Sequence, residues 1–434
     1  MDQEAKLLAR QLAQLGRVTD EPGKLTRTFL SLAMKRANAL VGGWMKEVGL
    51  KVRVDTVGNL IGRYESANPK AKTLLLGSHL DTVRDAGRFD GPLGVLLPIV
   101  TLAELRRQGV TLPFHVEVLG FSEEEGVRFA SAYLGSEGYT GRLKAGTLQL
   151  RDVDGVSVGE ALKKFNGGKF SLPKPAHRQS NLLGYIEVHI EQGPVLEARK
   201  LAVGVVSAIA GQSRFKLTWT GKAGHAGTTP MALRRDALAG AAEFMVGVEA
   251  IARRTPGLVA TVGALTVSPG AANVIPGEVL HTLDVRHAKD AVRRAALRQI
   301  GRLSNQVANR RGLVRRWQRT QNNGAVTCSP SLTAQLARSV AAVQGKSLSL
   351  VSGAGHDGVV VSALTPVAML FVRCRAGLSH HPDEYAAPKD LAVALAVMAD
   401  FLVRLADEQH QAPLPAAADP VFVPGSRRGR NRGK

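Results

Sequence analysis

Imidazole and carboxylate side chains recur at five places where an apolar run of the sequence gives way to a polar or glycine-rich segment. The set comprises His79, Asp90, Glu124 with Glu125, His189 and His380. A single histidine at the end of a strand is usually structural, and "EEEG" alone is typical of a solvated turn. Together these side chains form a donor set without thiolate, which suits zinc or its manganese, cobalt and nickel substitutes. The pattern therefore predicts a metal site.

Composition limits the alternatives. The chain has 434 residues, of which 44% are hydrophobic and 21% charged, so it is globular and long enough for two domains. Its two cysteines, Cys328 and Cys374, are too few for a disulfide framework or a thiolate metal site. The sequence lacks an apolar run of membrane-spanning length, and its N-terminus is an amphipathic helix pattern rather than a signal peptide. We expect a cytoplasmic protein with no membrane partner.

The formal net charge of +21 raises the alternative of a nucleic-acid-binding protein. Basic clusters lie at residues 310–319 and 426–434, without aromatic interleaving or a zinc-finger spacing. We interpret the charge as a solvated surface with a disordered basic tail at 411–434, and expect no specific nucleic-acid partner. A nucleic-acid-binding protein would also leave the metal-ligating set unexplained.

The elements that must position these side chains alternate between strand and helix. Helices are expected at 5–15, 26–48 and 94–109, a hairpin at 51–64, and buried strands at 73–81 and 113–126. This order predicts an α/β fold with a mixed, largely parallel sheet. Functional groups of such sheets gather at the carboxyl ends of the strands, as the candidate ligands do.

The pattern changes between residues 206 and 321. Strands and two helices, at about 232–253 and 291–310, follow one another in a β-α-β-β-α-β-like order. We expect a ferredoxin-like α+β domain inserted into a catalytic domain that is formed by residues 1–205 and 322–410.

Seven motifs carry a resemblance to a known family. They are "GSHLDTV" with "GRFDGPLGV", "FSEEEGVRF", "IEVHIEQGPVLE", "GKAGHAGTTPM", "ANVIPGEVLHTLDVRH", "SGAGHDG" and "GLSHHPDEY". In this order they resemble the motifs of the M20 metallopeptidase-like amidohydrolases. Within these they are most similar to N-carbamoyl-L-amino acid hydrolases, β-ureidopropionases and allantoate amidohydrolases. The resemblance covers about residues 5–405.

The resemblance implies two divalent metal ions per subunit, zinc or else manganese, cobalt or nickel. Asp90 would bridge both ions, His79 and His189 would complete the shell of one, and Glu125 and His380 that of the other. Two such ions activate a shared water and polarise the carbonyl under attack.

The resemblance also implies the remaining catalytic roles. Glu124 would be the general base, and Asp81 would orient the imidazole of His79. The inserted domain would be both lid and dimer interface. His225 would reach the partner subunit's active site and stabilise an oxyanion there. Without the resemblance, a structural histidine on a turn is the more ordinary interpretation of His225.

Five further residues would bind the substrate. Asn273 and Arg286 resemble the groups that hold its α-carboxylate, a task that suits the planar fork of arginine. Gln192 would bond the carbamoyl end, and Gly355 with His356 would form the floor of the site. As an alternative, Arg286 is an ordinary exposed strand residue.

The implied reaction is hydrolysis of a ureido C–N bond in a small N-carbamoyl-L-amino acid or an allantoate-like ureido acid. An M20 aminoacylase or dipeptidase would use nearly the same metals, but His189 with Gln192 argues against it. A relative that binds carbamoyl compounds without hydrolysing them would lack the base, and Glu124 is present.

Overall fold

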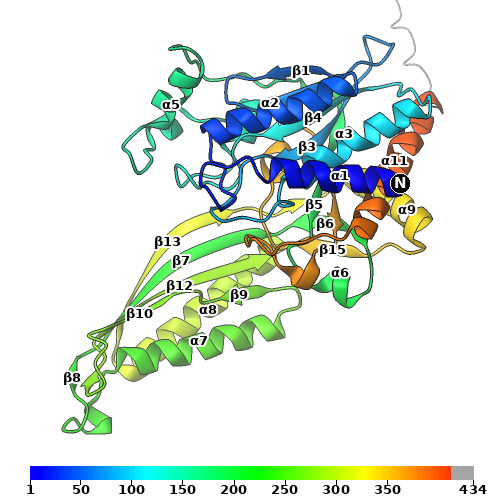
Figure 1. The fold of residues 1–434 in the computed structure, drawn as a ribbon. Helices are drawn as coiled ribbons and strands as arrows, with labels where there is room; N and C mark the ends of the chain where they lie inside the picture. Colours follow the sequence, from blue (N-terminus) through cyan, green and yellow to red (C-terminus); the bar gives the residue numbers. More distant parts are fainter. Residues whose placement is uncertain (412–434) are drawn as a thin grey trace, which may run out of the picture.

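The computed structural model describes residues 1–411, and the expected disordered tail at 411–434 lies, from residue 412 on, outside the described residues. In the described part, nine strands form one sheet in the order β1-β2-β4-β3-β5-β16-β6-β14, with β15 on β6 (Figure 1). Its strands are β1 (Lys51–Val54), β2 (Leu60–Tyr64), β3 (Thr73–His79), β4 (His115–Phe121), β5 (Leu182–Ile190), β6 (Val203–Ile209), β14 (Val326–Thr327), β15 (Ser349–Ser352) and β16 (Val367–Val372).

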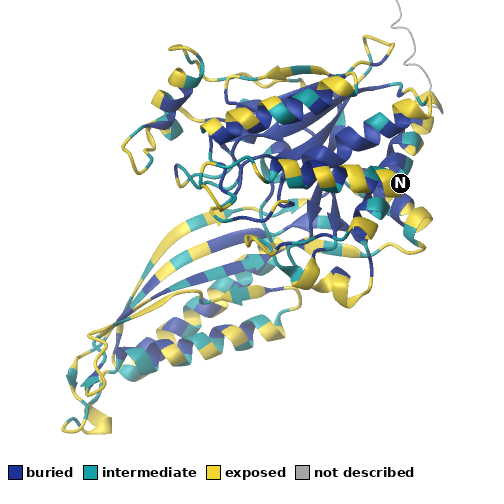
Figure 2. Cartoon of the chain, in the orientation of Figure 1, coloured by how far each residue is buried: buried dark blue, intermediate teal, exposed yellow. Residues whose placement is uncertain are grey.

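The four central strands of this sheet, β4, β3, β5 and β16, run parallel to one another. Every residue of β3 is buried, because both faces of a parallel sheet are covered. Leu74 and Leu76 join the main hydrophobic core on one face, and Leu75 packs on the other with Tyr139 and Tyr185. The centre of the sheet is accordingly buried throughout in Figure 2. The expected mixed, largely parallel sheet is confirmed.

Helices cover this sheet. The long ones are α1 (Asp2–Leu15), α2 (Leu32–Glu47), α3 (Pro92–Arg107), α9 (Pro330–Gln344) and α11 (Pro388–Gln411), and the short ones are α4 (Leu134–Tyr139), α5 (Val158–Phe165), α6 (Val195–Ala198) and α10 (Gly358–Val361). Within residues 1–411, no helix combines the length and apolarity needed to cross a bilayer.

The helix expected at 26–48 begins only at Leu32. Ser31 caps it, its hydroxyl accepting from the backbone N–H of Met34 at 3.0 Å. The preceding residues are occupied elsewhere: the buried Arg27 guanidinium donates to the carbonyls of Leu80 and Val18. This contact with the loop after β3 holds that segment out of the helix.

A second, smaller unit spans Gly211–Asn323 and is called the insertion here. It contains β7 (Gly211–Thr220), β8 (Gly224–His225), α7 (Ala237–Arg254), β9 (Val259–Thr261), β10 (Leu265–Ser268), β11 (Val274–Ile275), β12 (Glu278–His287), α8 (Asp290–Arg311) and β13 (Val314–Asn323). Its antiparallel sheet has the order β10-β12-β7-β13, with β9 also on β12. Counting β9 and β10 as one interrupted edge strand, this is the β-α-β-β-α-β order of a ferredoxin-like unit.

The insertion joins the rest of the chain through two adjacent crossings. Ile209, at the end of β6, pairs with Val326 of β14, so the chain leaves and returns side by side. Only Ala210 separates β6 from β7. The change of sheet therefore falls a few residues after the expected position 206, at Gly211, where a Cβ would be 2.5 Å from Asp290.

Candidate metal centre and active site

The candidate ligands lie at one edge of the large sheet. His79 is the last residue of β3, Glu124 and Glu125 follow the end of β4, His189 is near the end of β5, and His380 follows β16. These four strands are parallel neighbours, so their carboxyl ends meet at the same edge.

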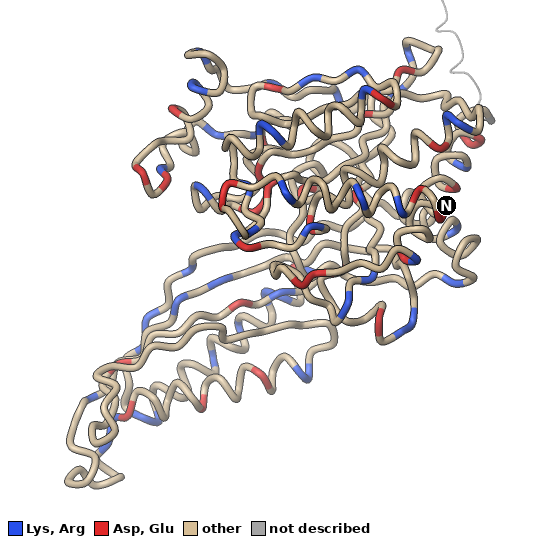
Figure 3. The backbone as a smooth tube through the Cα atoms, in the orientation of Figure 1, with Lys and Arg blue, Asp and Glu red and all other residues tan. Residues whose placement is uncertain are grey.

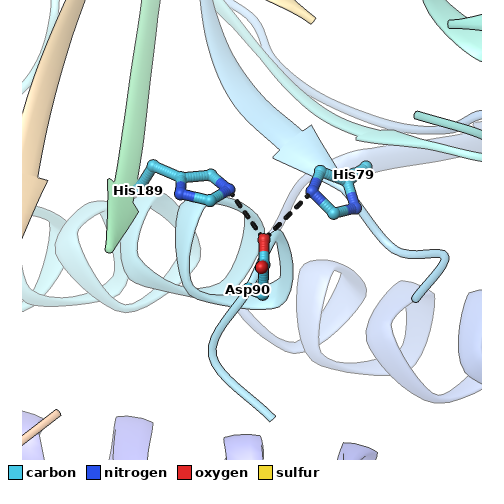
Figure 4. Close-up of side chains that lie close together, drawn as sticks. All are labelled: His79, Asp90 and His189. Atoms are coloured by element: carbon cyan, nitrogen blue, oxygen red, sulfur yellow. Dashed lines mark ion pairs between the residues drawn. The ribbon is translucent and has the colours of Figure 1, made fainter. Parts of the chain in front are cut away.

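Asp90, in the loop before α3, lies at the centre of this cluster. Its Oδ1 is 3.1 Å from Nε2 of His189 and 3.6 Å from Nε2 of His79 (Figure 4). Its Oδ2 is 3.2 Å from Nε2 of His380, and that nitrogen is 3.5 Å from Oε1 of Glu125. The two oxygens of one carboxylate thus face two separate groups of donors.

These separations fit ligands that share an ion. Two ligand atoms about 2.1 Å from one tetrahedral ion are roughly 3.4 Å apart. The donors of each trio, His79 with Asp90 and His189, and Asp90 with Glu125 and His380, lie within 4.8 Å of one another. The residues present therefore fit a pair of divalent cations bridged by a carboxylate.

Backbone carbonyls orient the two buried imidazoles. Nδ1 of His79 is 3.0 Å from the carbonyl oxygen of Asp81, and Nδ1 of His189 is 3.0 Å from that of Ile190. Both rings therefore present Nε2 to Asp90, the arrangement that metal-bound histidines need. Gly91 allows the close approach: with φ +80°, it lies where a Cβ would be 2.4 Å from the His79 ring.

Asp81 connects the two loops that carry the ligands. Its carboxylate oxygens accept from the backbone N–H groups of Glu124 and Glu125, each at 3.0 Å. One of them is 3.4 Å from Nδ1 of His79, so the carbonyl and the carboxylate of Asp81 both face that ring. Asp81 thus positions the neighbouring glutamates as well as the imidazole.

The buried carboxylates differ in proton affinity. Burial, followed by repulsion from Glu125, raises the pKa of Glu124 well above its ordinary value. Burial and the nearby Asp90 raise the pKa of Glu125 to about 7. Burial would also raise the pKa of Asp90, but His189 and the other imidazoles hold it well below its usual range. Because several buried carboxylates lie close together and repel one another, the cluster favours bound cations at its centre.

Two residues that the sequence did not point to, Glu384 and Ser379, hold Asp90 in place. Oε1 of Glu384 accepts from the backbone N–H groups of Phe89 at 2.8 Å and Asp90 at 3.1 Å. The Ser379 hydroxyl donates to Asp90 at 2.6 Å and lies 3.0 Å from Glu384. Both belong to "SHHPDEY", and an acidic residue four positions after the candidate ligand His380 was the available signal.

Gln192 and Gly355 lie beside the cluster. The side-chain amide of Gln192 donates to Oδ2 of Asp90 at 2.9 Å. Gly355 packs so tightly that a Cβ there would be 2.0 Å from the Tyr133 hydroxyl and 3.9 Å from Glu124. Gln192 and His380 also have positive φ, a conformation that non-glycine residues adopt mainly where the surroundings demand it.

His356 lies in the interior, behind His189. Its side chain is 1% exposed, and its Nε2 is 2.7 Å from the Ser352 hydroxyl. Its ring packs edge-on against that of His189, with centroids 4.5 Å apart. Burial and the neighbouring His189 lower its pKa well below the ordinary value. The His356 ring therefore packs behind His189 as a buried imidazole that does not favour a positive charge.

Arg286 lies near the end of β12 that approaches the large sheet. Its guanidinium donates to the Gly353 carbonyl at 2.6 Å and to both carboxylate oxygens of Asp284 at 3.0 and 2.8 Å. It borders a cleft of about 1440 Å³ that also reaches Gln192 and His380. Arg286 thus lies within the cleft that contains the exposed edge of the cluster.

His225 and Asn273 lie elsewhere. β8, which ends at His225, pairs with β11, and the Asn273 carbonyl accepts from the backbone N–H of Ala226 at 2.9 Å. This ribbon is at the outer end of the insertion (Figure 1). Asn273 precedes Glu278, the first residue of β12, and Glu278 is itself roughly 27 Å from Arg286, at about 3.4 Å per residue. Within one chain, neither residue joins the cluster.

The fold and the donor set define a class, the metal-dependent hydrolases with a parallel-sheet core. Residues 75–404 match the model of the peptidase family M20/M25/M40, and the chain belongs to this family. It is 40% identical to allantoate deiminase 2 of Glycine max over an alignment of 426 positions that covers 91% of this chain and 88% of that protein.

Two further relatives agree. An N-carbamoyl-L-amino acid amidohydrolase of Geobacillus stearothermophilus is 40% identical, and the match covers 93% of this chain and 99% of that protein. The crystal structure of an amidase of the hydantoinase/carbamoylase family from Burkholderia multivorans superimposes with a TM-score of 0.87 at 34% identity, covering 93% and 98% of the two chains.

Proposed function

We propose that this protein is a metal-dependent amidohydrolase that cleaves a ureido C–N bond in an N-carbamoyl-L-amino acid or an allantoate-like ureido acid. The observation that carries the proposal is the two-sided contact of Asp90, whose oxygens face His79 with His189 and His380 with Glu125. The relatives named as allantoate deiminase and N-carbamoyl-L-amino acid amidohydrolase support the substrate class.

Each side chain has a defined task in this reaction. Bound divalent ions supply the acidity of the attacking water and polarise the carbonyl. Glu124 would take a proton from that water and pass it to the leaving nitrogen, a task for which its buried position beside the donor set is suited. Asp81 holds the Glu124 backbone in place, and Arg286 binds the α-carboxylate of the substrate.

We further propose zinc or one of its manganese, cobalt and nickel substitutes as the metal, a homodimer and a cytoplasmic location. The oxygen and imidazole donors suit these ions. Both cysteines are free and buried, as in a reducing compartment. The remote His225 and Asn273 suit a dimer in which the insertion, acting as lid and interface, delivers them to the partner's site. Exposed Met231 and Leu233 at the same end support an interface there.

The test is ammonia release by the purified protein over a panel of ureido compounds. The panel contains N-carbamoyl-L-amino acids, their D-enantiomers, N-carbamoyl-β-alanine and allantoate, each with manganese or zinc and with chelator. Metal-dependent release from a ureido acid supports the proposal. Activity confined to N-acetyl-amino acids or dipeptides, scored by amine release, would instead identify an M20 aminoacylase or dipeptidase.

A further inference from the structure

Tyr133 lies where the loop after β4 enters α4, beside the proposed general base. Its backbone N–H donates to the Glu124 carbonyl at 3.2 Å. Two residues further on, the N–H of Gly135 donates to the Glu123 carbonyl at 3.1 Å. Because these two bonds tie the segments together, the position of Tyr133 relative to Glu124 is fixed.

The backbone of Tyr133 has an unusual conformation. Its φ is +70°, in the left-handed region that non-glycine residues seldom adopt. An aromatic residue stays in this region only where its surroundings hold it there. From this position its ring reaches the loop after β15, where a Cβ on Gly355 would be 2.0 Å from the Tyr133 hydroxyl. A glycine at position 355 thus leaves the space that the hydroxyl occupies.

The hydroxyl of Tyr133 is also close to the carboxylate of Glu124. The point that a Cβ on Gly355 would occupy is 2.0 Å from the hydroxyl and 3.9 Å from Oε1 of Glu124, so these two oxygens are at most about 5.9 Å apart. A carboxylate oxygen of Glu124 lies within 4.8 Å of ligand atoms of His79 and Glu125. The hydroxyl therefore borders the space around the base in which the reacting group must lie.

We propose that Tyr133 is a further catalytic residue, whose hydroxyl donates a hydrogen bond to the carbonyl oxygen of the ureido group as water attacks. This inference deepens the proposed function and rests on it, because it takes Glu124 as the general base. His225, the other donor proposed for that oxygen, is at the outer end of the insertion and would come from a partner subunit. Tyr133 is beside the base of its own chain.

The Tyr133 hydroxyl is free to form this bond. The side chain is half-buried, and within residues 1–411 every hydrogen bond of Tyr133 uses its backbone N–H or carbonyl. Burial, followed by the nearby Glu124, raises the pKa of Tyr133 well above its ordinary value, so the hydroxyl keeps its proton at neutral pH. The donor is thus in place before the substrate binds, as electrostatic stabilisation of a transition state requires.

The balance of the step gives each group one task. The water oxygen bonds to the carbonyl carbon, and an electron pair of the C=O bond moves to the carbonyl oxygen. Glu124 takes the proton of the water and gives it to the leaving nitrogen as the C–N bond breaks, while Tyr133 keeps its proton throughout. Its hydrogen bond strengthens as the oxygen gains charge, so it stabilises the transition state more than the bound substrate.

The experiment measures kcat and KM of Tyr133→Phe with manganese, on the ureido acid that the wild type hydrolyses fastest. We expect kcat to fall by about 100-fold and KM to stay within about threefold. Metal content and thermal midpoint should equal those of the wild type. Inhibition by N-phosphorylglycine, whose tetrahedral phosphoryl group resembles the attacked carbon, should weaken by a factor comparable to the loss of kcat.

The matched control is Tyr64→Phe. Tyr64 is also half-buried, but it ends β2 opposite Val116, at the amino end of β4 and away from the candidate ligands, so its loss should leave kcat and inhibition unchanged. An unchanged kcat in Tyr133→Phe, an equal loss in Tyr64→Phe, or a loss that comes with lost metal or with unchanged inhibition would overturn this inference alone. A wild type that releases ammonia from no ureido acid would overturn the proposed function with it.

Discussion

Two adjacent glutamates have different tasks in the proposed site. Oε1 of Glu125 is 3.5 Å from His380, within the trio around Oδ2 of Asp90. Glu124 is more deeply buried, and its backbone, like that of Glu125, is fixed by Asp81. A ligand and a proton carrier can thus be neighbours in sequence, and here a carboxylate oxygen of each lies within 4.8 Å of the other and of a ring nitrogen of His79.

Glu124→Gln should separate these tasks. The amide cannot accept the proton of water, so kcat should fall by about 100- to 10,000-fold while both metal ions remain. Steady-state kinetics and metal analysis by mass spectrometry measure the two effects. Glu125→Gln is the matched control and should lose metal. Full activity of Glu124→Gln would show that another group is the base.

Arg286→Ala should act on one class of substrate. Removing a charge-assisted contact should lower kcat/KM for N-carbamoylglycine by about 100-fold and leave its uncharged amide analogue within a few-fold. Kinetics on the two compounds give the answer, with Arg316→Ala as the surface control. An equal loss for both compounds would rule out the carboxylate role.

At the scale of single residues, the candidate metal ligands could be predicted from their residue types and from their positions at the ends of apolar runs. The roles of Glu384 and Ser379 could not be predicted, because their contacts with Asp90 join residues almost 300 positions apart in the chain. His356 was assigned to the substrate on the motif alone. Its burial behind His189 depends on packing between separate strands, which no local pattern reveals.

Single elements were predictable where one local signal dominated. The buried strands β3 and β4 follow from apolar runs, and α3 from helical periodicity with its glycine stop. The start of α2 was wrong by six residues because Arg27 is held by carbonyls from two other loops. A tertiary contact of this kind overrides helix propensity.

Strand β4 also contains a buried carboxylate away from the proposed site. Glu117 accepts from Tyr139 at 2.7 Å, from Arg63 at 3.0 Å and is 3.0 Å from Nε2 of His177. Burial opposes ionisation, but the bonds led by that of His177 lower the pKa of Glu117 to about 2. The ionised side chain therefore joins β4 to β2, to the end of α4 and to the segment that precedes β5.

Glu117→Gln should therefore lower the free energy of unfolding by about 3 kcal/mol at pH 7. Because the folded pKa lies below the ordinary 4.5, this stabilisation is complete above pH 4.5 and is lost as the pH falls towards 2. Urea unfolding at pH 7, 4.5 and 3 should show the difference from wild type shrinking over the last interval. The exposed Glu65→Gln is the control and should leave the urea midpoint nearly unchanged at each pH, because exposed ion pairs contribute little. A difference that does not vary with pH would contradict this account.

For the whole molecule, the position of His225 gives the sharpest prediction. If the partner supplies it, Glu124→Gln and His225→Ala subunits co-expressed in equal amounts should regain roughly one quarter of wild-type activity, since half the dimers are mixed and each has one complete site. Ammonia release from the unseparated, co-expressed population of dimers measures this. Each variant expressed alone is the control. If His225 served its own chain, no mixed site would be complete and activity would stay absent.

The order of elements in the insertion was predictable because each strand and helix carries its own periodicity. The first and last residues of the insertion were not predictable, because only one residue separates β6 from β7. The basic side chains, which suggested a possible nucleic-acid surface, are distributed over both the large sheet unit and the insertion in Figure 3. The interface between subunits depends on the complementarity of two surfaces, and no local pattern in a single sequence reveals it.

The pairing of Ile209 with Val326 has a consequence for engineering. Because the chain leaves the large sheet and returns to it at hydrogen-bonded neighbours, Gly211–Asn323 is a cassette with abutting ends. A chimaera that exchanges this cassette with that of a relative keeps every residue of the His79, Asp90 and His189 cluster while replacing Arg286 and the rest of the cleft that the insertion lines. Such a chimaera separates the contribution of the insertion to substrate choice from that of the candidate metal centre.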